Sequence, residues 1–214
     1  MTNTTLQRLS LDRLAQKIPA GVRYGLCFLV LAGFLAALIG QRALILRNGT
    51  EVRLTVMPID PRDLFRGDYV ILTYDISELR LDRLDGDKEF EKGDAIFVKV
   101  RPEGADGRAV AVGAYRSRPT VQAPEVVIEG RVTSSGRYPR LAVNRDGCEA
   151  KAPCQIVDVA YGIESYFVPE GEGRAIEAAD KSRLEVVAAV SRSGEAAIKR
   201  LLMDGRLLYA EPLY

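Results

Sequence analysis

Histidine is absent from this sequence of 214 residues. Its absence removes the usual general base of serine and cysteine nucleophiles and the commonest nitrogen ligand of zinc, copper and non-haem iron. The sequence also shows no nucleophile with a plausible base, no glycine-rich phosphate loop leading into a helix and no constellation of metal ligands. We therefore predict no catalytic residue, no metal site and no cofactor.

Net charge is also nearly absent. Thirty Lys and Arg residues stand against twenty-nine Asp and Glu residues, which leaves a formal charge of +1. No overall field draws such a chain to nucleic acid, so we expect no nucleic-acid partner. The hydrophobic fraction of 47% and the charged fraction of 28% are typical of a globular protein, and the length suits one folded domain with an attachment device.

The attachment device is an uncharged apolar run over residues 24–40, which is short for crossing a bilayer. Arg23 and Arg42 can reach the two interfaces, and residues 43–46 continue the apolar character. We predict a transmembrane anchor over residues 24–46. A buried core helix would have a polar face, and a cleavable signal peptide would end in a small-x-small pattern that is missing here.

Basic residues before the run indicate how the anchor is oriented. Against one acidic residue, Asp12, the preceding segment carries Arg8, Arg13, Lys17 and Arg23. Because basic residues favour the cytoplasmic side, residues 1–23 are predicted to form a cytoplasmic tail. Residues 48–214 are then predicted to form an extracytoplasmic domain.

An extracytoplasmic location would place two of the three cysteines where a disulfide can form. Cys148 and Cys154 enclose a short loop, and in an oxidising compartment a disulfide between them is the expected state. A redox switch is the alternative, although the spacing is not that of a CxxC motif. Cys27 lies inside the apolar run.

Beyond residue 50 the sequence is dominated by alternating apolar and polar residues, which indicate strands. Strand candidates begin near residues 51, 69, 95, 109, 125, 155, 184, 196 and 206. The candidate near 196 contains good helix formers, but we interpret it as a strand. Between the candidates lie the turn signals Asp85-Gly86, Asp106-Gly107, Ser135-Gly136, Asp146-Gly147, Ser193-Gly194 and Asp204-Gly205. The predicted fold is mainly β, an antiparallel barrel-like or sandwich-like domain, with one short helix over residues 173–181.

The segment "VMPIDPRDLFRGDYVILTYDIS", residues 56–77, is the most unusual stretch. As turn chemistry it is a rigid loop between two strands. It resembles the active-site segment of type I signal peptidases, but Val56 stands where their serine nucleophile would be. Asp60, Asp63 and Asp68 have the ligand type for Ca²⁺ or Mg²⁺, but their spacing fits no known loop and nearby arginines oppose a cation.

A closer resemblance comes from the string Gly67-Asp68-Tyr69-x-x-Leu72-x-Tyr74. It is the motif for which the GDYxxLxY family of membrane-anchored bacterial proteins is named, and the preceding Pro61, Arg62, Asp63 and Arg66 also match. A second block, "YGIESYFVPEGEGRAIE" at residues 161–177, resembles the family's downstream block through Tyr166, Pro169, Glu170 and Gly171. The likeness covers nearly the whole chain.

The resemblance implies a single-pass protein of the bacterial inner membrane with its β-rich domain in the periplasm. It implies no established activity, and many members of the family are encoded beside multi-spanning membrane proteins. The favoured hypothesis is therefore a binding or accessory module that contacts the bilayer through its anchor and an integral membrane protein through its outer domain. Arg66, Asp68 and Tyr69 are candidates for an exposed recognition surface, and Leu72 and Tyr74 for packing.

Two alternatives come from other classes. An envelope hydrolase could pair Asp63 or Asp68 with Glu164 or Glu170 across a cleft, which needs carboxyl groups about 5–9.5 Å apart. A purely structural spacer would need no partner at all.

Overall fold

A computed structural model of the chain describes residues 19–57, 69–138, 154–167 and 183–211. The chain divides into two compact units, residues 1–42 and residues 43–214. The predicted helix over residues 173–181 lies outside the described residues.

Helix α2, Ala20–Asn48, is the one long helix among the described residues. Its 29 residues extend about 43 Å at 1.5 Å per residue, which exceeds a hydrocarbon core of about 30 Å. Its most apolar window has a mean hydropathy of 2.2, and none of that window is buried inside the protein. The predicted N-terminal apolar helix is thus confirmed, and it is long and apolar enough to anchor the chain in a membrane.

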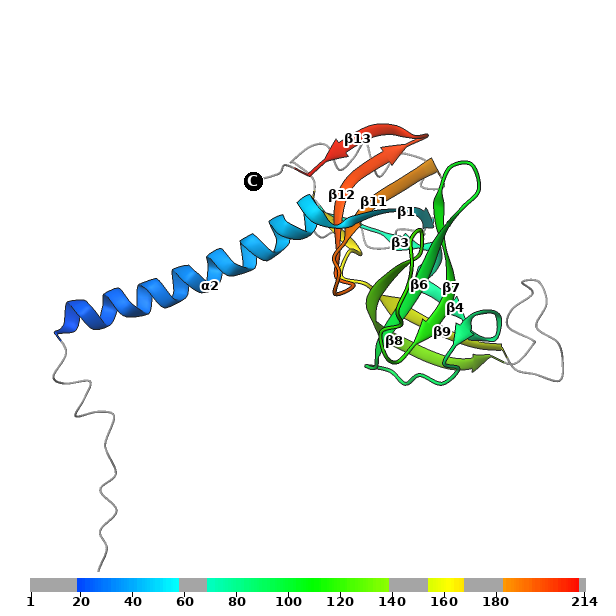
Figure 1. The fold of residues 1–214 in the computed structure, drawn as a ribbon, viewed down its shortest axis with the longest axis horizontal. Coiled ribbons are helices and arrows are strands. Elements are labelled where there is room, and N and C mark those ends of the chain that lie inside the picture. The colour runs from blue at the N-terminus through cyan, green and yellow to red at the C-terminus, as the bar shows by residue number, and fades with distance from the viewer. Residues whose placement is uncertain (1–18, 58–68, 139–153, 168–182, 212–214) are drawn as a thin grey trace, which may run out of the picture. The chain divides into compact units, whose positions relative to one another are not determined.

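The described residues of the second unit form mostly strands (Figure 1). In chain order they are β1 Thr50–Met57, β2 Tyr69–Ile71, β3 Thr73–Tyr74, β4 Glu78–Arg80, β5 Asp85–Gly86, β6 Ala95–Glu103, β7 Arg108–Tyr115, β8 Val126–Tyr138, β9 Cys154–Ala160, β10 Ser165–Phe167, β11 Leu184–Val190, β12 Ala196–Met203 and β13 Arg206–Ala210. Two 3-10 turns, η1 Asp75–Ser77 and η2 Leu81–Arg83, flank β4. The mainly β prediction is confirmed, and the segment near 196 is a strand.

Eleven of these strands form one sheet, whose order is β13-β12-β11-β1-β7-β6-β8-β9-β4, with β3 beside β1 and β5 beside β7. Most neighbours are antiparallel, as predicted, but β7 pairs in parallel with both β1 and β5. A meander of hairpins would contain no parallel pair. The β1–β7 contact joins strands that are distant in the sequence, since β1 lies between β11 and β7.

Turn chemistry explains two of the hairpins. Asp204 and Gly205 join β12 to β13 with φ values of 50° and 74°, the left-handed pair that a two-residue hairpin needs. Gly107, φ 63°, lies in the β6–β7 connection. The Ser135-Gly136 signal is wrong as a turn, because both residues continue strand β8 opposite Val157 and Ile156 of β9.

The core is formed by the inward-facing apolar residues of this sheet, and β11 is buried along its whole length. One face of β11 enters the main core. On its other face Ala189 packs with Ala197 of β12 and with Ile45 and Leu46 from the last turns of α2. Gly49 separates α2 from β1, and a β-carbon there would lie 2.6 Å from the carbonyl oxygen of Ile45. The helix end is therefore part of the domain's packing.

Candidate functional site

The two motif-bearing blocks meet in a small antiparallel sheet formed by β2 and β10. Tyr69 is opposite Phe167, and Tyr166 is opposite Val70. The backbone N–H of Leu72 extends the contact by donating to the carbonyl of Glu164 at 2.7 Å. Two segments that are far apart in the sequence are thus held side by side at the point where the motif enters the core.

Two tyrosines brace this junction from opposite directions. The hydroxyl of Tyr74 donates to the carbonyl oxygen of Ile163 at 2.5 Å, and the hydroxyl of Tyr161 donates to the carbonyl oxygen of Ile76 at 2.6 Å. Each block contains a Tyr-x-Ile triplet, Tyr74-Asp75-Ile76 and Tyr161-Gly162-Ile163. Each tyrosine therefore binds the isoleucine carbonyl of the other triplet, and we call this arrangement the tyrosine brace.

The tyrosine brace is buried. Tyr74 is 1% exposed and Tyr161 is 5% exposed. Burial raises the pKa of both phenols well above the usual value, and the nearby Glu164 carboxylate raises the pKa further in each case. Both hydroxyl groups are therefore neutral donors throughout the physiological range.

Glu164 holds the turn between the second triplet and β10. Its carboxylate accepts hydrogen bonds from the backbone N–H groups of Tyr161 and Gly162, the latter at 2.9 Å. Gly162 has a φ of 77°, a left-handed conformation that suits glycine. Glu164 thus holds the backbone of its own turn, which is a structural role.

The predicted packing role of Leu72 and Tyr74 agrees with their position, since each is 1% exposed in the core. The single strand expected from residue 69 to residue 76 is divided, however. Residues 69–71 pair with β10, residues 73–74 pair with β1, and η1 follows directly. The backbone changes partner at Leu72, so this short segment joins two sheets.

The remaining predicted residues fall into two groups. Tyr69 and Tyr166 are described by their backbone pairing in β2 and β10. Outside the described residues lie Pro61, Arg62, Asp63, Arg66, Gly67, Asp68, Pro169, Glu170 and Gly171. Three of the four carboxylates of the hydrolase alternative belong to this second group.

Tyr161 is the member of the site that our motif analysis did not select. The signal was present in the sequence, because Tyr161 repeats the Tyr-x-Ile triplet that ends the first block. The triplet alone does not predict which groups the two tyrosines contact, because those contacts join residues 85 and 89 positions apart.

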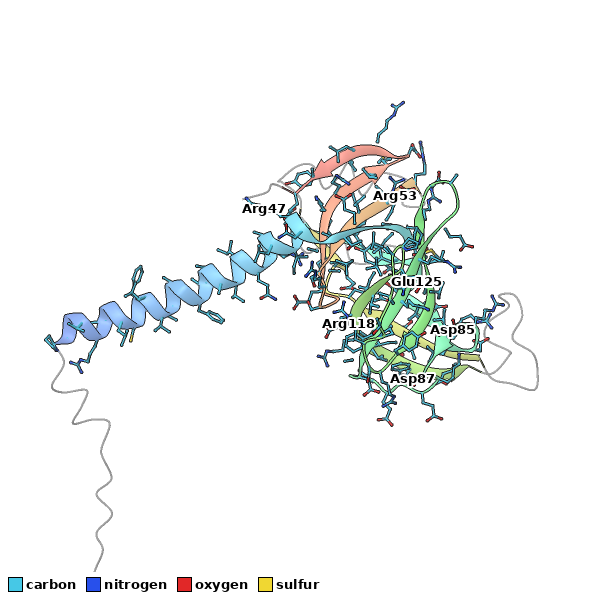
Figure 2. The ribbon with its side chains drawn as sticks, in the orientation of Figure 1. Arg47, Arg53, Asp85, Asp87, Arg118 and Glu125 are labelled. Carbon is cyan, nitrogen blue, oxygen red and sulfur yellow. The ribbon has the colours of Figure 1, made fainter. Side chains whose placement is uncertain are left out.

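A second polar cluster lies on β1, β7 and β11. Glu185 is 5% exposed within an otherwise apolar strand. Its Oε1 accepts a hydrogen bond from Arg108 Nε at 3.0 Å and forms an ion pair with Arg108 Nη2 at 2.7 Å, whereas its Oε2 is buried without a hydrogen-bond partner and lies 3.9 Å from Arg53 Nε. Arg53, marked in Figure 2, also donates to the Asp106 carbonyl in the β6–β7 turn.

The cluster joins the three strands electrostatically. Arg53 and Arg108 are direct Cα partners in the parallel β1–β7 contact, so two like charges lie side by side over Glu185. The buried carboxylate offsets the repulsion between them. Within the described ranges no group of three or more His, Cys, Asp or Glu residues could hold a metal ion.

The cysteines show no pairing in the described part of the chain. Cys27 is a free thiol exposed on α2. Cys154 begins β9, where its backbone lies opposite Tyr138. Cys148 lies outside the described residues, so the predicted disulfide has no support from the structure and stays a prediction.

The chain thus combines an N-terminal apolar helix, long enough to cross a membrane, with a mainly β domain whose two motif blocks are joined by the tyrosine brace. The chain belongs to the GDYXXLXY protein family, whose model matches residues 31–201. No curated protein and no solved structure matches the chain.

Proposed function

We propose that the protein is a membrane-anchored binding or accessory module of the bacterial envelope, whose β domain contacts an integral membrane protein outside the cytoplasm. The observation that supports this proposal is the tyrosine brace together with the β2–β10 sheet. These contacts hold Tyr69, where the Arg66-Gly67-Asp68 string ends, directly opposite Phe167, where the second block continues toward Pro169. These contacts thus hold one position of each block, Tyr69 and Phe167, next to each other.

A rigid base of this kind suits recognition. Side chains presented from segments with fixed ends lose less conformational freedom on binding than side chains on a free loop. Arg66, Asp68 and Tyr69 are the residues that we expect to contact the partner, because arginine and tyrosine are enriched among the residues that dominate binding energies.

The anchor proposal includes an orientation. We infer that residues 1–23 are cytoplasmic, that α2 is embedded in the inner membrane and that the domain lies in the periplasm, from the basic residues that precede the apolar run. A disulfide between Cys148 and Cys154 would accompany a periplasmic location. The prediction is that neither thiol reacts with a membrane-impermeant maleimide in spheroplasts until a reductant is added, and rapid labelling of both thiols without reductant would disprove the disulfide.

The functional proposal is tested by affinity purification of the full chain from detergent-solubilised membranes. The wild type, Arg66→Ala and the control variant Arg118→Ala are compared, since Arg118 is an exposed arginine of the same domain (Figure 2). An integral membrane protein should co-purify with the wild type and with Arg118→Ala, and its yield should fall at least about tenfold with Arg66→Ala. Failure of any membrane protein to co-purify with the wild type would remove the proposal. An equal yield from all three would remove Arg66 from the contact.

A further inference from the structure

Strand β13, Arg206–Ala210, lies at one end of the strand order of the large sheet and exposes two adjacent leucines (Figure 1). Leu207 is 60% exposed and Leu208 is 39% exposed. Among the described residues of the second unit, the other exposed large apolar side chains are those of Leu44, near the end of α2, and Met57, at the end of β1. Because exposed apolar side chains that are grouped indicate contact surfaces, whereas single ones do not, β13 is a candidate contact surface.

Strand pairing identifies the face of the sheet that carries these leucines. Leu207 is the register partner of Leu202 on β12, and paired residues project from the same face of a sheet. Tyr209 packs against the main core and is the partner of Leu201, which belongs to that core. Leu208 is the additional residue of the bulge between these two pairs. Leu207 therefore projects from the face of β13 that is turned away from the main core.

The end of α2 packs on the same face of β12. Ala197 of β12 packs with Ile45 and Leu46. Its neighbours Ala196 and Ile198 belong to the main core, so Ala197 projects from the opposite face. The last residues of the predicted anchor are thus buried against the face of the sheet that also carries the exposed leucines.

Chain length keeps this face close to the end of the anchor. Three residues, 47–49, lie between Leu46 and the start of β1, and they span at most about 11 Å. Along β12, Leu202 is five residues beyond Ala197, a distance of about 17 Å in a strand. Since β13 is the next strand, Leu207 lies within about 20 Å of the contact between α2 and β12.

The charges on this part of the sheet suit lipid headgroups. Strand β13 contains Arg206 and no acidic residue. On β12, Lys199 and Arg200 both form ion pairs with Glu51 of β1, at 3.0 Å in the case of Lys199. This group of three has one net positive charge, and Arg206 adds another. Basic side chains beside exposed leucines are typical of protein surfaces that lie in the interface of an anionic bilayer.

We propose that the outer face of β12 and β13 rests on the surface of the bilayer that holds α2, with Leu207 and Leu208 at the boundary of the acyl chains and Arg206 among the lipid phosphates. The bilayer is favoured over a protein as the occupant because the anchor keeps it beside this face permanently, at a high effective concentration. Such a contact would fix the orientation of the β domain on the membrane. The inference rests on the proposed function in one respect, namely that α2 is embedded in a membrane.

The absence of tryptophan from the chain provides a specific probe. The full chain carrying Leu207→Trp is reconstituted in nanodiscs of mixed zwitterionic and anionic lipids, with or without bromine on the acyl chains. Bromine quenches tryptophan fluorescence only at close range. The emission of Leu207→Trp should therefore fall about twofold in brominated nanodiscs, because its indole ring would lie at the bilayer interface.

Two single-tryptophan variants calibrate the measurement. Phe34→Trp, in the middle of the apolar run, should be quenched strongly if α2 is embedded. Glu78→Trp places the same side chain at an exposed position on β4, at the other end of the strand order, and should keep its emission (Figure 1). Quenching of Glu78→Trp to the level of Leu207→Trp would show that tryptophan itself draws the domain to the lipid, which would overturn the inference.

Two second-site variants test the assigned residues. In the Leu207→Trp chain, Leu208→Ser removes apolar area and Arg206→Glu reverses the charge beside it, so each should reduce the quenching. Both positions are exposed, so neither change removes a core contact. Unchanged quenching in both variants would overturn the inference.

The outcome is separable from the proposed function. If Phe34→Trp is quenched but Leu207→Trp behaves like Glu78→Trp, the domain does not rest on the lipid through β13, and the anchor stands. A blue-shifted emission of Leu207→Trp without bromine quenching would mean that protein, such as a second copy of the chain, covers the leucines, and this result also overturns the inference. If Phe34→Trp is not quenched, the membrane anchor is wrong and the inference fails with it.

Discussion

Tyr74 and Tyr161 form reciprocal hydrogen bonds, in which each hydroxyl donates to the isoleucine carbonyl two residues beyond the other tyrosine. The bonded pairs are 89 and 85 positions apart in the sequence. Since both bonds are buried, the entropy of closing this long loop is offset by contacts that water cannot replace. The brace is therefore where the two family blocks become one structural unit.

Removing either hydroxyl should destabilise the domain. Tyr74→Phe and Tyr161→Phe should each lower the free energy of unfolding by about 1–3 kcal/mol, because each leaves a buried carbonyl without its donor. Urea unfolding of the full chain in detergent micelles, followed by circular dichroism, measures the change. Tyr115→Phe is the matched control, since Tyr115 is half-buried, and a shift within about 0.5 kcal/mol is expected. Equal losses in all three variants would contradict a specific role of the brace.

The same tyrosines predict an alkaline instability. Burial holds the pKa of each phenol above the ordinary value of 10.0 in the folded state. Their stabilising contribution is therefore complete below about pH 10 and is lost as the pH rises toward the folded-state pKa values, by about 1.4 kcal/mol per pH unit for each tyrosine. Urea midpoints from pH 9 to about pH 12 should fall more steeply for the wild type than for Tyr74→Phe/Tyr161→Phe. Identical slopes would contradict the prediction.

Much of this fold was predictable from periodicity. The sequences of β6, β7, β8, β11 and β12 either alternate between apolar and polar residues or are continuously apolar. Such a pattern predicts a strand whichever strand it pairs with. The Asp204-Gly205 hairpin was equally predictable, because Asp-Gly favours the type I′ turn, in which both central residues are left-handed.

The features of the fold that the sequence did not predict depend on contacts between residues that are distant in the sequence. Ser135-Gly136 has the composition of a turn but lies in β8, where pairing with β9 decides its conformation. The alternation over residues 69–76 predicts one strand, yet the chain changes its pairing partner at Leu72. The local sequence does not indicate which strand a segment will pair with. The burial of Glu185 depends in the same way on Arg108 from another strand.

The junction between helix and domain should be intolerant of a side chain. In Gly49→Ala the new β-carbon would lie 2.6 Å from the Ile45 carbonyl oxygen and 3.0 Å from the Ala189 β-carbon. Because one contact is to backbone, the last turn of α2 must shift, at a cost of about 1–3 kcal/mol in the free energy of unfolding. Gly40→Ala is the control in the same helix, where a β-carbon meets nothing within 4 Å. A loss of similar size in the control would show that the junction is not the cause.

The buried carboxylate predicts an asymmetric pair of variants. Arg108→Met should lower the free energy of unfolding by about 3 kcal/mol, because it removes the partner of the buried Glu185 carboxyl group and leaves only Arg53 at 3.9 Å. Arg108→Met/Glu185→Leu should recover most of that loss, because no buried charge remains. Arg101→Met, at an exposed position on β6, controls for loss of a surface arginine. No recovery in the double variant would mean that packing by Arg108, rather than the charge of Glu185, causes the loss.

The contribution of Asp75 to stability should depend on pH in the opposite sense to that of an ordinary ion-paired aspartate. Desolvation raises its pKa above the ordinary 3.8 despite the hydrogen bonds from backbone N–H groups and the nearby Arg108, so the folded state binds the proton more tightly than the unfolded state. The stabilising contribution of this group is thus present at low pH and is lost as the pH rises through the folded-state pKa. Asp75→Asn, which stays neutral, should therefore raise the urea midpoint at pH 7, and the gain should disappear below about pH 4.

Asp85→Asn is the control for the Asp75 measurement, because Asp85 is exposed and should leave the midpoint unchanged at both pH values. A lower midpoint of Asp75→Asn at pH 7 would mean that the carboxylate's hydrogen bonds in η1 outweigh its desolvation.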